Sequence, residues 1–190
     1  MNSEALFERE TETLNTLIQS EPKHYNAWSH KLFLSKLFKV YESNLGHEIS
    51  FTQKFIEMDV RNNSAWSYRR HCFSLSTSVE WDSEVSFALA CIKQAPSNES
   101  PWVYLRSIPE WFRYPEIESV CSDLQQLYRS AEGRQSCDHR HFVDTLAMMY
   151  EKTGRKPAAF AMRDDLAESD LNRQSLLRFR NQSTDSKSII

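Results

Sequence analysis

Residues that could carry chemistry by themselves are sparse in this sequence. The cysteines lie 19, 30 and 16 positions apart, without the Cys-x-x-Cys pair or the neighbouring histidines of a zinc site. There is no Gly-x-Ser-x-Gly, no His-Glu-x-x-His and no Gly-rich loop with a phosphate-binding lysine. The pair Asp164-Asp165 lies in a charge-rich helical stretch, which indicates a solvated surface. We therefore expect no complete active site and no metal site within this chain alone.

The composition favours long helices. The chain has 190 residues, with 3 Gly and 6 Pro beside 40% hydrophobic and 26% charged residues. So few Gly and Pro leave little material for the tight turns of β-sandwiches, barrels or nucleotide-binding loops. Basic and acidic residues number 23 and 26, a net charge of −3, which does not indicate nucleic-acid binding. No apolar run reaches the ~18 residues of a membrane span, and we expect a cytoplasmic protein with free thiols.

Three tryptophans mark an internal repeat. They lie 38 and 36 residues apart, and each follows an isoleucine by ten positions. A polar break rich in Pro, Asn and Ser separates each isoleucine from its tryptophan, which predicts the end of one helix and the cap of the next. Each unit is therefore predicted to be a helical hairpin, at residues of about 10–44, 47–78 and 80–110. The tryptophans are Trp28, Trp66 and Trp102.

A hairpin of this kind cannot bury its apolar stripe alone. The units are therefore expected to stack into an all-α, right-handed α-α solenoid, with the three tryptophans in its core. Helical spacing continues from Ile117 to Leu127, from about Asp138 to Lys152, and from about Pro157 to Asn181, with residues 131–136 as a loop. We expect a single repeat domain over residues 1–181 and a short flexible tail over residues 182–190.

The three polar breaks resemble those of a known family. Their strings are Pro22-Lys23-His24-Tyr25-Asn26-Ala27-Trp28, Asp59-Val60-Arg61-Asn62-Asn63-Ser64-Ala65-Trp66 and Asn98-Glu99-Ser100-Pro101-Trp102. In order and approximate spacing they resemble the protein prenyltransferase alpha-subunit repeat, over residues of about 10 to 110. The second and third strings look more like the alpha subunit shared by protein farnesyltransferase and geranylgeranyltransferase type I than like its Rab-specific relative.

The resemblance implies one subunit of a heterodimeric enzyme. In the family, a crescent of helical hairpins wraps a separate beta subunit, which holds the catalytic Zn²⁺ and most of the isoprenoid pocket. Mg²⁺ is implied for the heterodimer as well, and no cofactor for this chain. The reaction transfers a farnesyl or geranylgeranyl group from its diphosphate to a cysteine near the C-terminus of a protein substrate. We expect this chain to be inactive without its partner.

The resemblance also assigns candidate site residues. Lys23, Tyr25 and Asn26 stand where family loops face the diphosphate, and a cation with phenol hydroxyls would stabilise the charge of that leaving group. The residues expected at the interface with the beta subunit are His24, Arg61, Asn62, Asn63, Asn98 and Glu99. The residues alone leave alternatives open: Lys23 as a solvated loop cation, Tyr25 packed over Trp28, and the polar residues of the breaks as helix caps.

The sequence also departs from the family pattern. In repeat order Lys23 falls one hairpin after the family's catalytic lysine, and Asn26 replaces a diphosphate-facing histidine. The family's Trp-x-x-Arg arginine is Arg69 in the second unit, but Lys31 in the first and Leu105 in the third. We expect the run from Arg69 to His71 to form a solvated face. Family members carry further repeats before these three, so we expect an N-terminally short form: a fragment, an isoform or a paralogue.

Two functions are compatible with these features. The first is the alpha subunit, or an N-terminally truncated form of it, of heterodimeric protein farnesyltransferase or geranylgeranyltransferase type I. The alternative is a noncatalytic helical-repeat adaptor that binds another protein. Tyr25 and the string from Asp59 to Ser64 favour the first function, whereas the small number of repeats favours the second.

Overall fold

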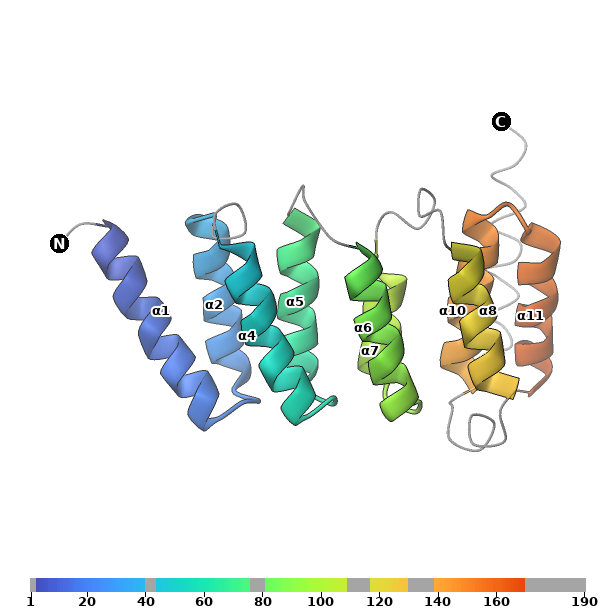
Figure 1. The fold of residues 1–190 in the computed structure, drawn as a ribbon, viewed down its shortest axis with the longest axis horizontal. Helices are drawn as coiled ribbons and strands as arrows, with labels where there is room; N and C mark the ends of the chain where they lie inside the picture. The colour runs from blue at the N-terminus through green and yellow to red at the C-terminus, as the bar shows by residue number, and fades with distance from the viewer. Residues whose placement is uncertain (1–2, 40–43, 76–80, 109–116, 130–138, 170–190) are drawn as a thin grey trace. The chain divides into compact units, whose positions relative to one another are not determined.

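A computed structural model of the chain describes residues 3–39, 44–75, 81–108, 117–129 and 139–169. All regular elements in these residues are α-helices, which confirms the predicted fold class (Figure 1). They are α1 (Ser3–Ser20), α2 (Tyr25–Leu37), α4 (Leu45–Met58), α5 (Asn63–Leu75), α6 (Trp81–Gln94), α7 (Glu99–Arg106), α8 (Ile117–Arg129), α10 (His139–Lys152) and α11 (Lys156–Ser169). The predicted loop at 131–136 and tail at 182–190 lie outside the described residues.

The helices pair as hairpins. The chain divides into two compact units, residues 1–91 and 92–190, and the boundary falls inside α6. In the first unit α1 packs against α2 and α4 packs against α5, while α2 also packs against α5. In the second unit α10 packs against α7, α8 and α11. None of the helices in the described segments combines the length and the apolar character needed to cross a membrane.

The polar breaks close the hairpins with side-chain caps. His24 accepts a hydrogen bond from the Ala27 backbone N–H at Nδ1, 3.1 Å away, at the start of α2. Asn62 Oδ1 accepts from the Ala65 N–H at 3.1 Å, at the start of α5. Each side chain satisfies one of the N–H groups that a helix leaves unpaired in its first turn. In the second unit Asn98 caps α7 in the same way.

Each tryptophan fastens the loop that precedes it. The indole N–H of Trp28 donates to the Pro22 carbonyl at 2.8 Å, and that of Trp66 donates to the Val60 carbonyl at 2.9 Å. In the second unit Trp102 donates to a carbonyl six residues earlier in the same way, at 2.8 Å. The three side chains are 3%, 2% and 0% exposed in chain order. This position needs both a large buried ring and an N–H donor, which tryptophan alone combines.

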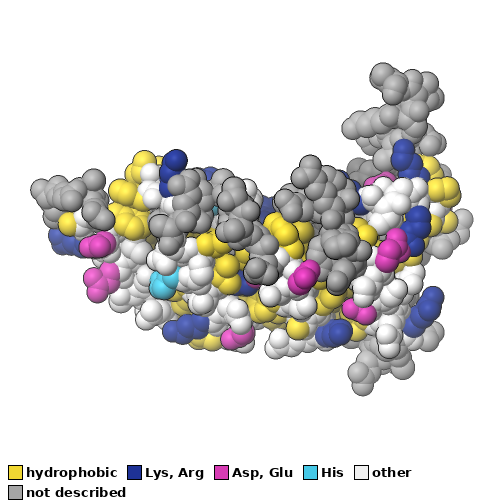
Figure 2. Space-filling view, turned by 45° about the horizontal axis from the view of Figure 1, so that its top comes forward, with side chains coloured by type: hydrophobic (Ala, Val, Ile, Leu, Met, Phe, Trp, Pro, Cys, Tyr) yellow, Lys and Arg dark blue, Asp and Glu magenta, His cyan; other side chains and the backbone are white. Residues whose placement is uncertain are grey.

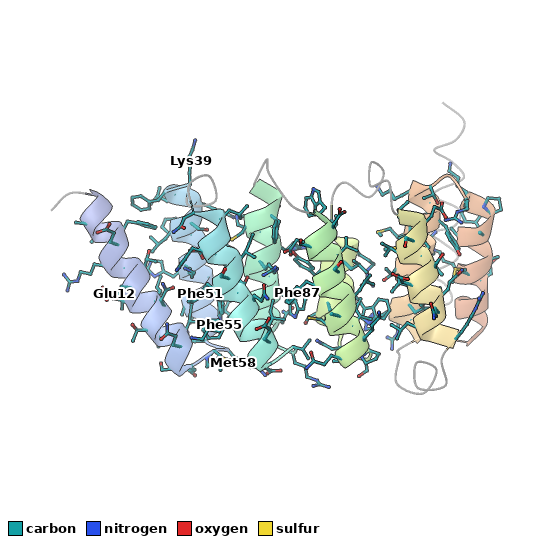
Figure 3. The ribbon with its side chains drawn as sticks, viewed as in Figure 1. Glu12, Lys39, Phe51, Phe55, Met58 and Phe87 are labelled. Atoms are coloured by element: carbon teal, nitrogen blue, oxygen red, sulfur yellow. The ribbon has the colours of Figure 1, made fainter. Side chains whose placement is uncertain are left out.

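Aromatic rings surround the first tryptophan. Phe51 and Phe55 lie one turn apart on α4, with ring centroids 5.0 Å apart (Figure 3). The Phe55 ring meets that of Trp28 edge-on at 5.6 Å, and the Tyr68 ring lies 5.7 Å from it. Such pairs add to the burial energy of each ring. The core of the first unit is therefore built around the junction of α2, α4 and α5.

The second unit has a separate core. Leu124 of α8 and Met149 of α10 are each 0% exposed, and Trp102 of α7 is buried as well. Gly154, at φ 77°, ends α10, and α11 begins two residues later. Because this left-handed backbone conformation strains any residue with a Cβ, glycine suits the position. The predicted helix end at about Lys152 and the predicted restart at about Pro157 agree with these bounds.

Candidate functional site

Lys23 joins the first two hairpin loops. Its Nζ lies 2.6 Å from Asp59 Oδ2, and the two side chains are 62% and 40% exposed. The hydrogen bond from Lys23 is the main cause that holds the pKa of the Asp59 carboxyl below its ordinary value, and the bond from the Arg61 N–H adds to it. Lys23 therefore lies at the surface, as expected of a solvated loop cation, but its amine forms an ion pair with the Asp59 carboxylate.

Asn62 joins the same two loops from inside the molecule. Its Nδ2 donates to the Pro22 carbonyl at 2.9 Å, while its Oδ1 caps α5. The residue is 1% exposed. We expected Asn62 at a subunit interface, but both ends of its amide bind within the chain. The structure thus assigns it to capping and to loop packing.

The other candidate residues lie at or near the surface. Tyr25 is 73% exposed and Asn26 is exposed beside it in the first turn of α2. His24, the cap of α2, is partly exposed, with its Nε2 3.9 Å from the Glu21 carboxylate. Of the remaining candidates, Arg61 and Asn63 are exposed in the first unit. In the second unit Glu99 is exposed and Asn98 is partly exposed.

A buried ion pair links the first hairpin to the second. Lys31 Nζ lies 3.0 Å and 3.2 Å from the two carboxylate oxygens of Glu48, and both residues are 3% exposed. The Tyr68 hydroxyl donates to the same carboxylate at 2.8 Å. Burial is the largest of the causes that raise the pKa of this phenol, so it stays protonated as a donor. The three groups satisfy one another inside the first unit.

Arg69 repeats this arrangement in the second hairpin and corrects a prediction. We expected a solvated face from Arg69 to His71, yet Arg69 is 2% exposed. Its guanidinium contacts both carboxylate oxygens of Glu84 in α6, at 2.5 Å and 2.8 Å. It also donates to the Ile49 carbonyl and to Thr52 Oγ1 in α4, at 2.9 Å and 3.1 Å. Arg70, the next residue, is exposed as expected.

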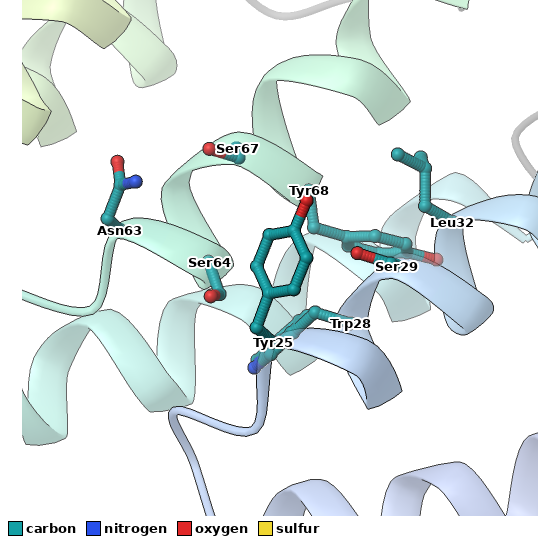
Figure 4. A pocket seen from close by; sticks show the side chains of 8 residues that line it. All are labelled: Tyr25, Trp28, Ser29, Leu32, Asn63, Ser64, Ser67 and Tyr68. Atoms are coloured by element: carbon teal, nitrogen blue, oxygen red, sulfur yellow. The ribbon is translucent and has the colours of Figure 1, made fainter.

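A hollow of about 210 Å³ opens between the N-terminal halves of α2 and α5. Its walls are polar: Tyr25 and Ser29 come from α2, and Asn63, Ser64 and Ser67 come from α5 (Figure 4). Trp28 and Tyr68 form its floor with Leu32. Of the residues expected by resemblance, only Tyr25 and Asn63 line it. The serines were missed because an isolated serine in a helix carries no distinctive sequence signal.

The faces around this hollow lack charge. The exposed positions of α2 as far as Phe33, and those of α5 as far as Ser67, carry no Asp, Glu, Lys or Arg. They are Tyr25, Asn26, Ser29, His30 and Phe33 on α2, and Asn63 and Ser67 on α5. We call this surface the neutral face. By contrast, the exposed positions of α1 include Glu8, Arg9 and Glu12, and those of α4 include Lys54 and Glu57.

One face of the molecule is mixed in charge. The view in Figure 2 shows basic and acidic side chains interspersed, without one sign gathered into a large patch.

Burial raises the pKa of the Cys72 thiol to about 12, and those of Cys91 and Cys121 to about 11. These thiols are therefore poor nucleophiles and poor metal ligands. Cys137 lies outside the described residues.

The arrangement is that of an all-α repeat protein whose polar loops and neutral face lie outside its core. The model of the family "Protein prenyltransferase alpha subunit repeat" matches residues 7–38, 45–76 and 81–112, about half of the chain. The chain therefore belongs to the protein prenyltransferase alpha subunit repeat family. The matched ranges fall on the three tryptophan units.

Curated relatives include alpha subunits of two kinds. The chain is 30% identical over 109 residues to the protein farnesyltransferase/geranylgeranyltransferase type-1 subunit alpha of Arabidopsis thaliana, covering 52% of this chain and 31% of that protein. It is 33% identical over 100 residues to the geranylgeranyl transferase type-2 subunit alpha of Sus scrofa, covering 53% of this chain and 17% of that protein. The matches thus span a third or less of these relatives.

A solved structure shares the fold. It is described as Candida albicans protein geranylgeranyltransferase-I complexed with GGPP. The TM-score is 0.65 at 26% sequence identity, and the match covers 92% of this chain and 58% of that chain. The similarity extends past the three tryptophan units, since it covers more of the chain than they do.

Proposed function

We propose that this chain is an alpha-type subunit of a heterodimeric protein prenyltransferase, and that its partner is a beta subunit. The neutral face is the observation that carries this proposal. In a chain with 26% charged residues, an exposed surface of aromatic, hydroxyl and amide side chains without formal charge is unusual. Protein interfaces are depleted of charge and enriched in aromatic residues at their centres. Family membership supplies the identity of the partner.

We place the subunit with the farnesyltransferase and geranylgeranyltransferase type I group. The Arabidopsis relative and the Candida structure support this choice, as does the string from Asp59 to Ser64. The type-2 relatives match at similar identity, so the choice between the two groups is tested by assaying prenyl transfer to each class of substrate. The acceptor in either case is a protein cysteine, and the donor is an isoprenoid diphosphate.

The chemistry in this proposal is divided between the subunits. Zn²⁺ is proposed on the beta subunit, where it would activate the substrate thiol, and Mg²⁺ is proposed for the heterodimer. No group of three or more His, Cys, Asp or Glu side chains is placed to hold a metal ion in the part of the chain that the structure describes. This chain contributes the scaffold and the loops before α2 and α5. We propose that it acts in the cytoplasm.

Three side chains, one in the first loop and two at the start of α2, are proposed to face the diphosphate. The phenol of Tyr25 and the amide of Asn26 are exposed together at the start of α2. The Lys23 amine sits against Asp59, so it would approach a diphosphate only with this carboxylate beside it. A contact made in the transition state lowers kcat when it is removed. Tyr25→Phe and Lys23→Ala in the assembled enzyme test the two contacts.

A noncatalytic adaptor is the second candidate. The same neutral face would bind a different protein. The ion pair between Lys23 and Asp59 favours this function, because the Lys23 amine already contacts a carboxylate instead of a diphosphate. An adaptor would be monodisperse without a beta subunit. It would add nothing to prenyl transfer.

Co-expression with a beta subunit of the farnesyltransferase type tests the proposal. The purified mixture is separated by size-exclusion chromatography, and the pooled peak is assayed with farnesyl and with geranylgeranyl diphosphate. Co-elution in a 1:1 complex is the expected result, and transfer activity would establish a working subunit. Co-elution without activity would leave a scaffold subunit, whereas separate elution from both type I and type II beta subunits would favour the adaptor.

A further inference from the structure

The hollow between α2 and α5 has a chemistry unlike that of a diphosphate site. Its walls present hydroxyl groups and one amide, and among the described residues that line it none is charged. A diphosphate is normally bound by Arg, Lys or a metal ion, because its several negative charges need compensation. The hollow therefore fits an uncharged group better than it fits an anion.

Three cations near the hollow contact carboxylates, whereas Arg61 is exposed in the loop before α5. Lys23 contacts Asp59, Lys31 contacts Glu48, and the guanidinium of Arg69 contacts Glu84. The basic residues Lys36 and Arg70 lie toward the C-terminal halves of α2 and α5, where burial is the main cause that lowers the pKa of His71 and their two charges add to it. The N-terminal end of the neutral face, which holds the hollow, thus receives little uncompensated positive charge from the three paired cations or from these two residues.

The size of the hollow points to a single side chain. Small-molecule sites usually enclose about 300–1,000 Å³, whereas this hollow encloses about 210 Å³. Its floor offers the rings of Trp28 and Tyr68, and its walls offer hydrogen-bonding groups at two levels of α5, Ser64 and Ser67. Aromatic rings with a polar rim suit a group that is apolar along its body and polar at its end.

We propose that the hollow receives one uncharged, hydrogen-bonding side chain of the partner subunit. Its apolar body lies on the Trp28 and Tyr68 rings, and its polar end bonds to the serine hydroxyls. Glu48 acts through Tyr68: its carboxylate accepts a hydrogen bond from the phenol and so holds the ring that forms the floor. The inference rests on the proposed function, because the partner is the beta subunit named there.

The start of a helix also attracts anions, and this alternative predicts a different result. Two helices begin at the hollow, α2 at Tyr25 and α5 at Asn63. The side chains of His24 and Asn62 already accept one N–H of each first turn. An anionic occupant would bind more tightly when a lysine is added at the wall of the hollow. An uncharged occupant would bind more weakly when either a positive or a negative charge is added there.

The test places opposite charges at Ser67, which is exposed on the wall of the hollow. Binding of the beta subunit to the Ser67→Asp and Ser67→Lys chains is measured by isothermal titration calorimetry. We expect both to bind at least about 100-fold more weakly, because each buries a charge without a partner. The matched controls are Ser50→Asp and Ser50→Lys on the exposed side of α4, for which binding should stay within about 3-fold.

The outcomes separate this inference from the proposed function. Tighter binding of Ser67→Lys with weaker binding of Ser67→Asp would indicate an anionic occupant and overturn the inference, as would unchanged binding of both. Wild-type chain that fails to bind any beta subunit would instead remove the proposed function, and the inference with it. If a Ser67 variant does not fold, judged by circular dichroism, the same pair at Ser29 on the opposite wall replaces it.

Discussion

Asn62 donates a 2.9 Å hydrogen bond to the carbonyl oxygen of Pro22, a residue 40 positions earlier in the chain. The same carbonyl accepts the indole N–H of Trp28. One backbone oxygen thus fixes a loop both to its own helix and to the next hairpin. The stacking of hairpins in the first unit depends on polar contacts between loops as well as on apolar burial.

The substitution Asn62→Ala should therefore destabilise the fold more than the loss of an ordinary helix cap does. The change removes the cap of α5 and leaves the Pro22 carbonyl with one fewer donor. We expect the free energy of unfolding to fall by about 2–3 kcal/mol, measured by urea denaturation. Asn63→Ala, at an exposed neighbouring position, should stay within about 0.5 kcal/mol. Equal effects of the two changes would contradict this role for Asn62.

Arg69→Met should destabilise the fold strongly. The substitution keeps an apolar stem but leaves the Glu84 carboxylate buried without the guanidinium. Breaking such a pair costs about 3–5 kcal/mol, whereas Arg70→Met at the exposed next position should change stability by about 0.5 kcal/mol or less. Thermal or urea unfolding of both variants provides the comparison. A solvated Arg69 would show no difference between them.

The Lys23–Asp59 pair gives a prediction about pH. Lys23 holds the pKa of Asp59 in the folded state below its unfolded value. The pair therefore stabilises the folded state fully at a pH above the unfolded pKa, and this contribution is lost as the pH falls through the folded pKa. Both side chains are partly exposed, so the gain is at most about 1 kcal/mol. In Lys23→Ala, NMR titration should show the Asp59 pKa moving up toward 3.8. An unchanged pKa would mean that the pair does not form in solution.

Burial of the thiols predicts slow alkylation. With pKa values of about 12, 11 and 11, Cys72, Cys91 and Cys121 hold little thiolate at pH 8. Iodoacetamide labelling followed by mass spectrometry should modify each at least about 100-fold more slowly than in urea. Labelling of Cys72 in native protein at the urea rate would contradict its placement in the core of the first unit.

The sequence predicted the hairpins because their determinants are local. Each tryptophan binds a carbonyl six residues before it, and His24 and Asn62 each cap an N–H three residues after them, so a repeated local spacing accompanies each hairpin. Family resemblance added the proposed function. These signals identified Trp28, Trp66 and Trp102 together with the loops around them.

The buried ion pairs were missed because their partners come from the next hairpin. Arg69 has Arg70 and His71 beside it in sequence, which suggests a solvated face, yet its carboxylate lies 15 residues further on at Glu84. One signal was available, since Lys31 also has a glutamate 17 residues later, at Glu48. The neutral face was missed for a related reason: it is an absence of charge spread over two helices that only the fold brings together.

The measurement that tests the neutral face most directly is the affinity of the beta subunit for Phe33→Glu. Phe33 is 58% exposed on α2, and a glutamate there would place a charge on the neutral face. The matched control is Glu12→Lys on the exposed side of α1 (Figure 3). We predict at least about 100-fold weaker binding for Phe33→Glu and a change within about 3-fold for Glu12→Lys. Equal affinities of both variants and the wild-type chain would contradict the neutral face as the partner-binding surface.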